Sequence, residues 1–276
     1  MTATPLTWLY VPGDRPEVVS KALASGADVV VVDLEDAVAP DRKEYAREAT
    51  AERLADPQPV PVHVRINALD GPLATRELRA LERLPGVSGL RLPKVTTPQE
   101  VVRVAARTGT GVPLYALLET ALGIEHAFAI ATAHPALHGI ALGEADLRAD
   151  LGVRGDTGLD WCRSRVVVAA RAAGLAPPPQ SVHPDTRDLD TLAGSCAHGR
   201  ALGFLGRAAI HPRQLPVIER AYLPTPEEIE EAEQIVKAAA TDEGAQALPD
   251  GRFIDAAVVT SARRTLSLAD RHRDRS

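Results

Sequence analysis

The stretch GADVVVVDLEDAV, residues 26–38, decides the fold class of this chain. Four consecutive valines lead directly into Asp33, Glu35 and Asp36, so an unbroken apolar run ends in acidic side chains. A strand that is apolar on both faces is typical of a parallel sheet, because the helices of βαβ crossovers cover both of its faces. We therefore expect an α/β protein whose strand ends carry polar groups.

Comparable apolar runs recur about every 25 to 30 residues, with helical patterns between them. The expected strands are residues 8–11, 29–34, 60–66, 90–95, 114–118, 137–142, 180–183 and 208–210. The expected helices are residues 16–25, 42–54, 72–84, 98–107, 124–133, 159–173, 192–202 and 213–222. Thr-Pro-x-Glu at 97–100 and 225–228 marks two helix starts, because a hydroxyl N-cap there precedes Pro at N1 and Glu at N3.

Eight strands that alternate with helices predict one (β/α)8 TIM barrel over residues 1–224, followed by a C-terminal helical extension over residues 225–276. The extension contains two more helical patterns, at 227–240 and 256–268, which a barrel does not need. A doubly wound open sheet is the competing interpretation. The G-x-G-x-x-G fingerprint of a dinucleotide-binding fold, however, does not follow the first strand.

The composition excludes several classes of function. The 276 residues are 45% hydrophobic and 25% charged, which is ordinary for a globular protein and unlike a disordered chain. A net charge of −6 with both signs interspersed argues against nucleic acid or a membrane surface as the partner. The apolar runs are far shorter than the roughly 18 residues of a membrane span, and no secretory signal is visible at the N-terminus. We expect a cytoplasmic enzyme.

Barrel enzymes build their sites at the carboxyl ends of the strands, and here every expected strand ends in ionisable side chains. Glu119 and Asp146 follow the fifth and sixth strands. Two carboxylates that leave the remaining positions to water and substrate form the arrangement that Mg²⁺ prefers, so we expect a Mg²⁺ site on these residues. The spacing of the acidic residues in the sequence also allows Glu144 or Asp36 as a metal ligand. The alternative role of Glu119 is a structural ion pair across the barrel mouth.

Three basic residues are candidates for substrate binding. Arg65 ends the third strand, and its planar guanidinium suits a substrate carboxylate; the alternative is charge balance for nearby acids. Arg15 and Lys21 lie at the first expected helix, whose N-terminus favours phosphate groups, and a solvated helix face is the alternative there.

These residues lie in motifs that resemble the citrate lyase β-subunit (citryl-CoA lyase) family of the HpcH/HpaI aldolase superfamily. The matching motifs include LYVPGDRPE (9–17), GADVVVVDLEDAV (26–38), LPKV (92–95), LLETALGI (117–124), ALGEADLRADLG (141–152) and GRFIDAAVV (251–259). They are collinear and span almost the whole chain. The resemblance implies a Mg²⁺-dependent (β/α)8 barrel, a homotrimer or hexamer, that acts on CoA or acyl-carrier thioesters of 3-hydroxy acids.

The resemblance also implies roles for single residues. Glu119 and Asp146 match the family's metal ligands. Arg65 matches the arginine that holds the substrate's carboxylate or oxo group. The positions that contact CoA in the similar malyl-CoA lyases correspond here to Tyr10, Arg15 and Lys21.

Three acidic residues complete the machinery that the resemblance implies. Asp255 matches an acid that relatives insert into a neighbouring subunit's site, so the 225–276 extension is expected to act as a lid, with Asp255 as acid/base at the thioester carbon. Glu35 or Asp36 is expected to support the water shell of the metal. The chain departs from its relatives on the sixth strand, where Gly-x-Glu-Asp-Leu is usual, and in PQSVHPD (179–185). Both departures concern the identity of the substrate more than the class of reaction.

Together these observations predict a Mg²⁺-dependent lyase that cleaves a 3-hydroxyacyl thioester of the citryl-CoA, malyl-CoA or citramalyl-CoA type to an oxo acid and an acyl-CoA. One alternative is a thioesterase of the malyl-CoA type, in which water attacks the acyl carbon. Another is a citrate lyase β subunit that is active only with its α-subunit and acyl-carrier partners.

Overall fold

A computed structural model of the chain describes residues 4–108, 111–240, 246–247 and 253–273. The chain divides into two compact units, one formed by Pro5–Glu219 and the other by Arg220–Ser276 together with Met1–Thr4. Residues 251 and 252 of the tail motif lie outside the described residues.

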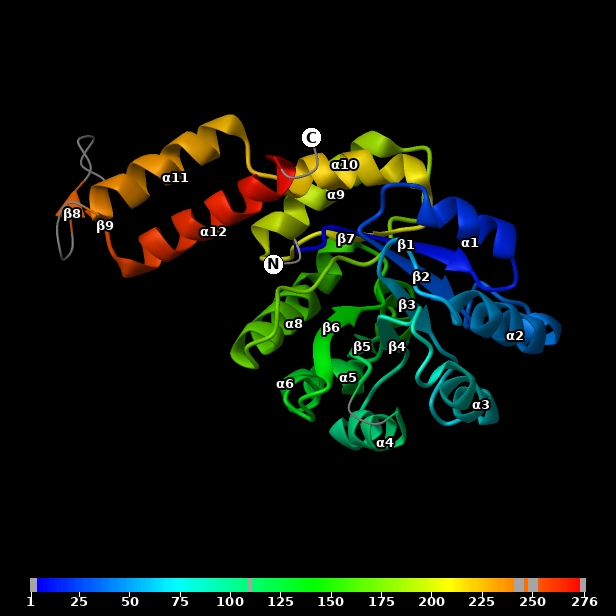
Figure 1. Ribbon diagram of the computed structural model, residues 1–276. Coiled ribbons are helices and arrows are strands. Elements are labelled where there is room, and N and C mark those ends of the chain that lie inside the picture. The colour runs from blue at the N-terminus through cyan, green and yellow to red at the C-terminus, as the bar shows by residue number, and fades with distance from the viewer. Residues whose placement is uncertain (1–3, 109–110, 241–245, 248–252, 274–276) are drawn as a thin grey trace. The chain divides into compact units, whose positions relative to one another are not determined.

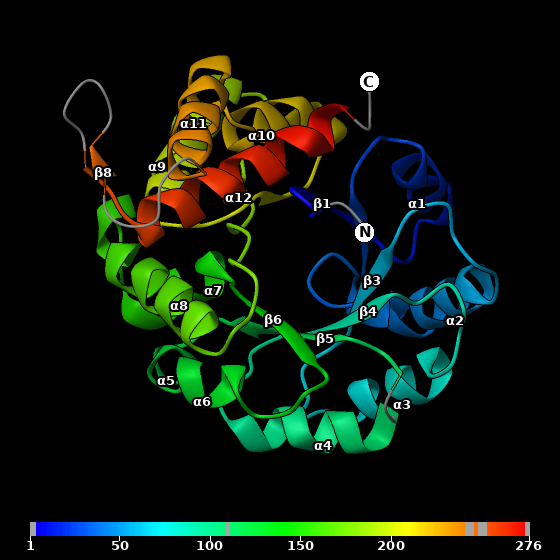
Figure 2. The same cartoon turned by 60° about the vertical axis from the view of Figure 1, so that its left-hand side comes forward.

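The larger unit is built on one parallel sheet. Its strands are β1 (Thr7–Pro12), β2 (Val29–Asp33), β3 (Val62–Arg65), β4 (Gly89–Leu92), β5 (Leu114–Leu118), β6 (Leu137–Leu142) and β7 (Arg207–Ala209). The strand order is β6-β5-β4-β3-β2-β1-β7, with every pairing parallel. The sheet curls around its own interior and carries its helices on the outside, as Figure 2 shows. This arrangement confirms the predicted α/β class with a parallel sheet, and it is consistent with a TIM-barrel-like fold.

One expected strand differs from the prediction. In the segment expected at 180–183, only Gln180 pairs, through an isolated parallel bridge to Arg207. Among the described residues no ladder joins this segment to β6, so the hydrogen-bonded sheet has seven strands and stays open there. The sequence accounts for the difference, because the prolines at 177–179 and 184 lack the backbone N–H that a ladder requires.

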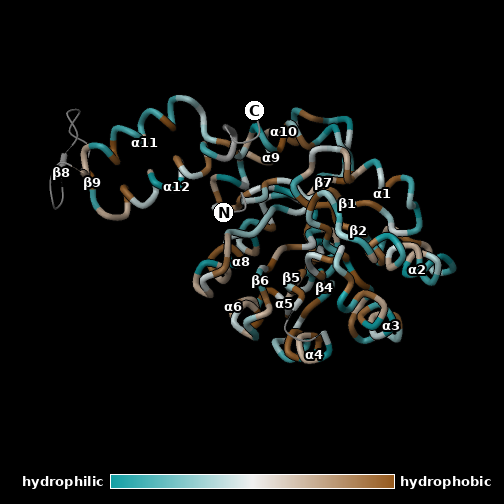
Figure 3. The backbone as a smooth tube through the Cα atoms, viewed as in Figure 1, coloured by the Kyte–Doolittle hydropathy of each residue, from teal (hydrophilic) through white to brown (hydrophobic). Residues whose placement is uncertain are grey.

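The helices of this unit follow the predicted positions closely. They are α1 (Pro16–Leu23), α2 (Lys43–Leu54), α3 (Pro72–Leu81), α4 (Pro98–Thr108), α5 (Ala121–Glu125), α6 (Ala127–Ala131), α7 (Glu144–Leu151), α8 (Asp160–Ala172), α9 (Leu189–Ala201) and α10 (Leu215–Tyr222), with short 3-10 turns η1 (Pro40–Arg42), η2 (Asp156–Leu159) and η3 (Pro212–Gln214). Figure 1 shows them around the sheet, and in Figure 3 they alternate between hydrophobic brown and hydrophilic teal, as expected for helices with one buried face. The sequence did not predict α7, and the helix expected at 124–133 is divided at His126 into α5 and α6.

The interior of the sheet is apolar toward the beginning of the strands. Trp8, Val29 and Val31 form a buried cluster against which Tyr10 packs. His63 is also buried and stacks on the ring of Tyr115 at 4.4 Å, so it belongs to the core. The polar residues at the ends of β1 and β2 therefore follow a buried apolar cluster along these strands.

The smaller unit is mainly a pair of helices. It contains α11 (Pro226–Ala239), α12 (Ala256–Arg273) and two short antiparallel strands, β8 (Gln246–Ala247) and β9 (Phe253–Ile254). Thr225 and Glu228 form the predicted capping box at the start of α11. Ala232, Ile235, Ile254 and Ala262 make its core. None of the helices in the described ranges has the length and hydrophobicity of a membrane span.

Candidate active site

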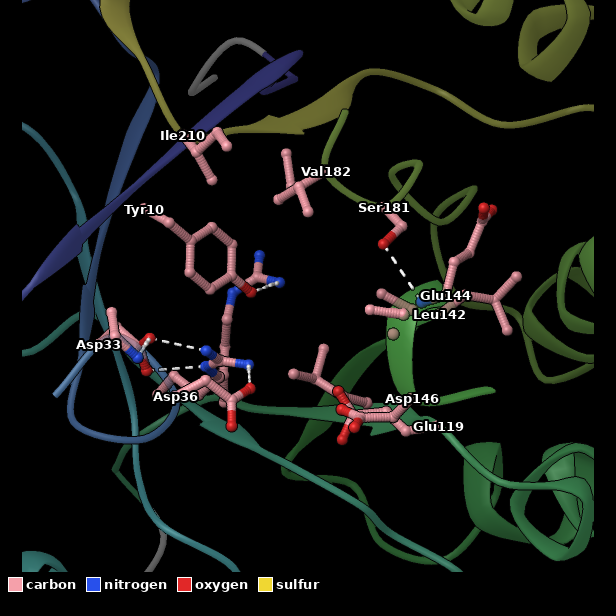
Figure 4. A pocket seen from close by; sticks show the side chains of 18 of the residues that line it. Tyr10, Asp33, Asp36, Glu119, Leu142, Glu144, Asp146, Ser181, Val182 and Ile210 are labelled. Atoms are coloured by element: carbon pink, nitrogen blue, oxygen red, sulfur yellow. Dashed lines mark hydrogen bonds and ion pairs between the residues drawn. The ribbon is translucent and has the colours of Figure 1, made fainter. Parts of the chain in front are cut away.

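A cavity of about 410 Å³ opens at the carboxyl ends of the strands. Five of the predicted site residues line it, namely Tyr10, Asp36, Arg65, Glu119 and Asp146. In Figure 4 the carboxylates of Glu119 and Asp146 lie beside each other, across the cavity from Asp33 and Asp36. The curled parallel sheet thus gathers residues that are far apart in the sequence at one rim.

Glu119 is a buried carboxylate that has no basic side chain as partner among the described residues. It is 2% exposed, and its Oε2 accepts a hydrogen bond from the backbone N–H of Lys94 at 2.9 Å. Lys94 adopts a left-handed φ of 53°, a sparsely populated conformation that functional sites often hold. Burial, together with the charges of Glu35 and Asp146, raises the pKa of Glu119 to about 7, although the charge of Arg65 and the hydrogen bond from Lys94 act to lower it. A cation beside Glu119 would favour the charged form of the carboxylate and so offset the free-energy cost of burying it.

Gly143 makes room for this carboxylate. A Cβ built on Gly143 would stand 2.6 Å from Cδ of Glu119 and closer still to its Oε1 and Cγ. Gly143 also precedes α7, whose first turn carries the half-buried Asp146. The sequence at the end of β6 therefore brings a second carboxylate to the rim without displacing the first.

The structure distinguishes between the two acids of α7. Glu144 binds Arg163 in a fork, with Nε–Oε1 and Nη2–Oε2 distances of 2.8 and 2.7 Å, and Figure 4 shows its side chain turned away from Glu119. Asp146 has no hydrogen-bond partner among the described residues, and its charge acts on both Glu119 and Lys94. The described residues contain no group of three or more potential His, Cys, Asp or Glu ligands, so the candidate metal site is the carboxylate pair of Glu119 and Asp146.

Arg65 is in contact with three carboxylates. Its Nε and Nη2 donate to the two oxygens of Asp33 at 2.8 and 2.6 Å, and its Nη1 lies 3.1 Å from both Glu35 and Asp36. Burial acts to lower the pKa of Arg65, but the hydrogen bonds and charge of Asp33 raise it above its ordinary value. The charge-balance role that the sequence left open is therefore present. Asp36 is 56% exposed, so this one partner is free to give way to a ligand.

Glu35 links Arg65 to Lys94. Its Oε1 lies 3.0 Å from Nζ of Lys94, and its Oε2 lies 3.1 Å from Nη1 of Arg65. Burial raises the pKa of Glu35, while Arg65 and Lys94 lower it. The Nζ of Lys43 donates to the backbone oxygens of Leu34 and Glu35, which fixes the loop that carries these acids.

Two of the predicted residues of the larger unit, Arg15 and Lys21, do not line the cavity. Arg15 and Lys21 are exposed at the two ends of α1, and neither forms an ion pair in the described part of the chain. The hydroxyl of Tyr10 accepts a hydrogen bond from Arg91 at 3.3 Å inside the cavity. Asp255 belongs to the smaller unit, where its exposed carboxylate accepts a hydrogen bond from the backbone N–H of Val258 at 2.9 Å.

Sequence reasoning did not single out Gly143 or Arg91. Nothing in the sequence around Gly143 reveals that a glutamate 24 positions earlier lies against it. Arg91 did give a signal, because a charged residue stands between the leucines of an otherwise apolar strand, where such residues are rare unless they are paired.

Comparison with known proteins gives consistent matches. A family model described as HpcH/HpaI aldolase/citrate lyase matches residues 6–212. The chain is 34% identical to the citrate lyase subunit beta of Escherichia coli K12, over 98% of this chain and 94% of that protein. It is 35% identical to a (3S)-malyl-CoA thioesterase of Cereibacter sphaeroides, over 95% and 93% of the two chains. The crystal structure of CitE from Mycobacterium tuberculosis in complex with magnesium, acetoacetate and coenzyme A aligns with a TM-score of 0.83 and 34% identity, covering 98% of this chain and 100% of that one.

Proposed function

Because the chain belongs to the HpcH/HpaI aldolase/citrate lyase family, which makes it an enzyme of the lyase class, we propose that it cleaves a carbon–carbon bond in a 3-hydroxyacyl-CoA thioester with Mg²⁺ held by Glu119 and Asp146. The thioester is of the citryl, malyl or citramalyl type, and the products are an oxo acid and an acyl-CoA. The observation that carries this proposal is the buried carboxylate of Glu119, which has no basic side chain as partner among the described residues and lies beside Asp146. The magnesium in the M. tuberculosis relative supports the choice of metal.

The two carboxylates fit a hard divalent cation. Both are oxygen ligands, Gly143 leaves space around Glu119, and Arg163 keeps Glu144 away from the pair. When bound, Mg²⁺ supplies positive charge that lowers the pKa of the substrate's 3-hydroxyl group and stabilises the oxo acid. The carboxylate pair then has a charge partner at neutral pH.

The chain's own residues orient the substrate and move protons. Arg65, fixed by both oxygens of Asp33, holds the carboxylate of the oxo-acid half when the exposed Asp36 gives way. As the 3-hydroxyl proton passes to a base, the O–H electron pair forms the carbonyl group of the oxo acid. The bond between C2 and C3 then breaks, and the electron pair of that bond forms the thioester enolate. Arg65 and Lys94 provide positive charge near it, because such charge is usually the largest catalytic contribution. Asp255 of a neighbouring subunit returns a proton to C2, and Glu35 and Asp36 support the water around the metal.

The CoA part of the substrate is assigned to Tyr10, Arg15 and Lys21. Arg15 and Lys21 are exposed cations on α1, which begins directly after the strand that carries Tyr10 into the cavity. Arg15 lies at the N-terminus of α1, which favours phosphate groups, and Lys21 in the last turn adds a second positive charge, while the phenol ring suits the acyl end. We assign the protein to the cytoplasm as a homotrimer or hexamer, in which the extension over 225–276 closes a neighbouring subunit's site.

Two alternatives have support of their own. The thioesterase from C. sphaeroides is as similar to this chain as the E. coli β subunit is, which favours hydrolysis of a malyl thioester as the second candidate. The likeness to the β subunit itself favours a protein that requires α-subunit and acyl-carrier partners.

The test is an assay of the full chain with citryl-CoA, malyl-CoA and citramalyl-CoA, with Mg²⁺ and with EDTA, in which oxo acid and free CoA are measured separately. Oxo acid released together with an acyl-CoA only when Mg²⁺ is present supports the lyase. Free CoA without oxo acid supports the thioesterase. No turnover of any thioester contradicts a stand-alone lyase and favours the subunit that depends on partners.

A further inference from the structure

A second arginine lines the cavity beside Arg65. Arg91 lies on β4 and is the register partner of Arg65 on β3, so the two side chains start from the same level of the sheet. Arg91 is only 3% exposed, which places its positive charge inside the barrel. Arg91 lines the same cavity as Glu119 and Asp146.

Arg91 has no acidic partner among the described residues. Its Nη1 donates to the hydroxyl of Tyr10 at 3.3 Å, and its guanidinium carbon lies 5.7 and 5.6 Å from the ring centroids of Tyr10 and Tyr115. Its Nε is buried without a hydrogen-bond partner. These aromatic contacts attract a cation weakly, but they do not neutralise it.

The groups around Arg91 supply no negative charge. His63 is neutral, because burial and then the charge of Arg91 hold its pKa well below the ordinary value. Burial raises the pKa of Tyr115, so its phenol stays protonated near neutral pH. Asp33, Glu35 and Asp36 are all engaged with Arg65. An uncompensated guanidinium in such surroundings is costly unless an anion arrives with the ligand.

We infer that Arg91 binds a second carboxylate on the oxo-acid half of the substrate, apart from the carboxylate that Arg65 holds. The inference rests on the proposed function and narrows it to an acyl group with a carboxymethyl substituent at C3. Of the three thioesters considered, only the citryl type carries that group, whereas the citramalyl and malyl types carry a methyl group and a hydrogen. Cleavage transfers the C2–C3 electron pair to the thioester carbon and leaves a dicarboxylic oxo acid. Arg91 is thus the residue that determines specificity.

The test compares the binding of oxaloacetate and pyruvate to the full chain in the presence of Mg²⁺, by isothermal titration calorimetry. Oxaloacetate has the second carboxylate and pyruvate does not. Wild type is expected to bind oxaloacetate more tightly than pyruvate. Arg91→Met is expected to weaken the binding of oxaloacetate by about tenfold or more and to change the affinity for pyruvate little, because only oxaloacetate loses a charge-assisted contact. Arg91→Lys should fall between the two. Arg79→Met, a change at an exposed position on α3, is the matched control.

A second measurement does not depend on the metal. Without ligand, Arg91→Met is expected to raise the melting temperature above that of wild type, because it removes a buried charge that has no counter-charge. A lower melting temperature, or an equal loss of oxaloacetate and pyruvate binding, would overturn the role of Arg91. If wild type favours oxaloacetate no more than pyruvate, the inference fails although the lyase reaction stands. If no thioester is cleaved and neither oxo acid binds, the proposed function fails as well.

Discussion

Gly143 lies so close to the side chain of Glu119 that a Cβ on residue 143 would stand 2.6 Å from the carboxyl carbon. Real Cβ atoms are essentially never this close to another heavy atom, so the two residues depend on each other. The backbone of Gly143, with φ −102° and ψ 87°, does not itself require glycine. The glycine is needed for the space that Glu119 occupies.

Gly143→Ala is therefore expected to displace the Glu119 carboxylate and to weaken Mg²⁺ binding by about tenfold or more, as changes around metal ligands commonly do. The measurement is a Mg²⁺ titration followed by calorimetry, with the circular dichroism spectrum as a check on the fold. Gly194→Ala on α9 is the matched control, because a Cβ there meets nothing within 4 Å. Equal Mg²⁺ affinity in Gly143→Ala and wild type would contradict the role of Glu119 as a ligand.

Glu144 and Asp146 should respond differently to loss of charge. Asp146→Asn is expected to abolish Mg²⁺-dependent turnover, because it removes a ligand. Glu144→Gln should retain turnover and lower the stability of the protein, because it loses the fork to Arg163 and a weaker ion pair with Arg148 but no metal ligand. Activity at saturating Mg²⁺ and urea unfolding separate the two effects. Should Glu144→Gln lose all Mg²⁺ dependence while Asp146→Asn keeps it, the ligand assignment would have to be reversed.

Arg65 and Asp33 should be coupled in stability as well as in position. Arg65→Met leaves Asp33 buried without its charge partner, and breaking a buried pair in this way costs about 3 to 5 kcal/mol. The double variant Arg65→Met with Asp33→Leu should recover part of that loss, because no unpaired charge remains. Urea unfolding of the two single variants and the double variant gives the coupling energy. Strictly additive effects would show that the fork does not stabilise the barrel rim.

The sequence predicted the strands best where apolar runs are unbroken, as at Val29–Val32. It predicted the carboxylate pair because Glu119 and Asp146 follow consecutive strands. It did not predict α7, whose eight residues bury only Leu147 and so lack a clear apolar stripe. The segment at 180–183 looked like a strand by its apolar residues, but the prolines on either side of it leave only one bridge.

Side-chain contacts between strands could not be predicted from the sequence for a different reason. The register that pairs Asp33 with Arg65 is set by the packing of the whole sheet, and the two residues are 32 positions apart. A sequence shows that acids and an arginine reach the same rim, but not which of them pair. Arg91 illustrates the same point, since the fold, and not the sequence, decides that it forms no ion pair with a carboxylate of the described residues.

The ion cluster that holds α7 to η2 and α8 should give the protein a defined acid sensitivity. Arg163 and Arg148 both contact Asp156, and hydrogen bonding to Arg163 is the main reason that the pKa of Asp156 falls from 3.8 to about 2. A depressed folded-state pKa adds stability that is fully present above the unfolded value and is lost as the pH falls toward the folded value. The difference in unfolding free energy between wild type and Asp156→Asn should thus be constant above about pH 5 and should shrink below pH 4. Because the Asp156 side chain is 61% exposed, the effect is small and weakens further at high salt.

Urea unfolding at pH 6, 5, 4 and 3 measures this difference, with Asp41→Asn, a change at an exposed position in η1, as the control. A difference that is unchanged at pH 3 would show that the charge of Asp156 does not contribute to holding the helix that carries Asp146.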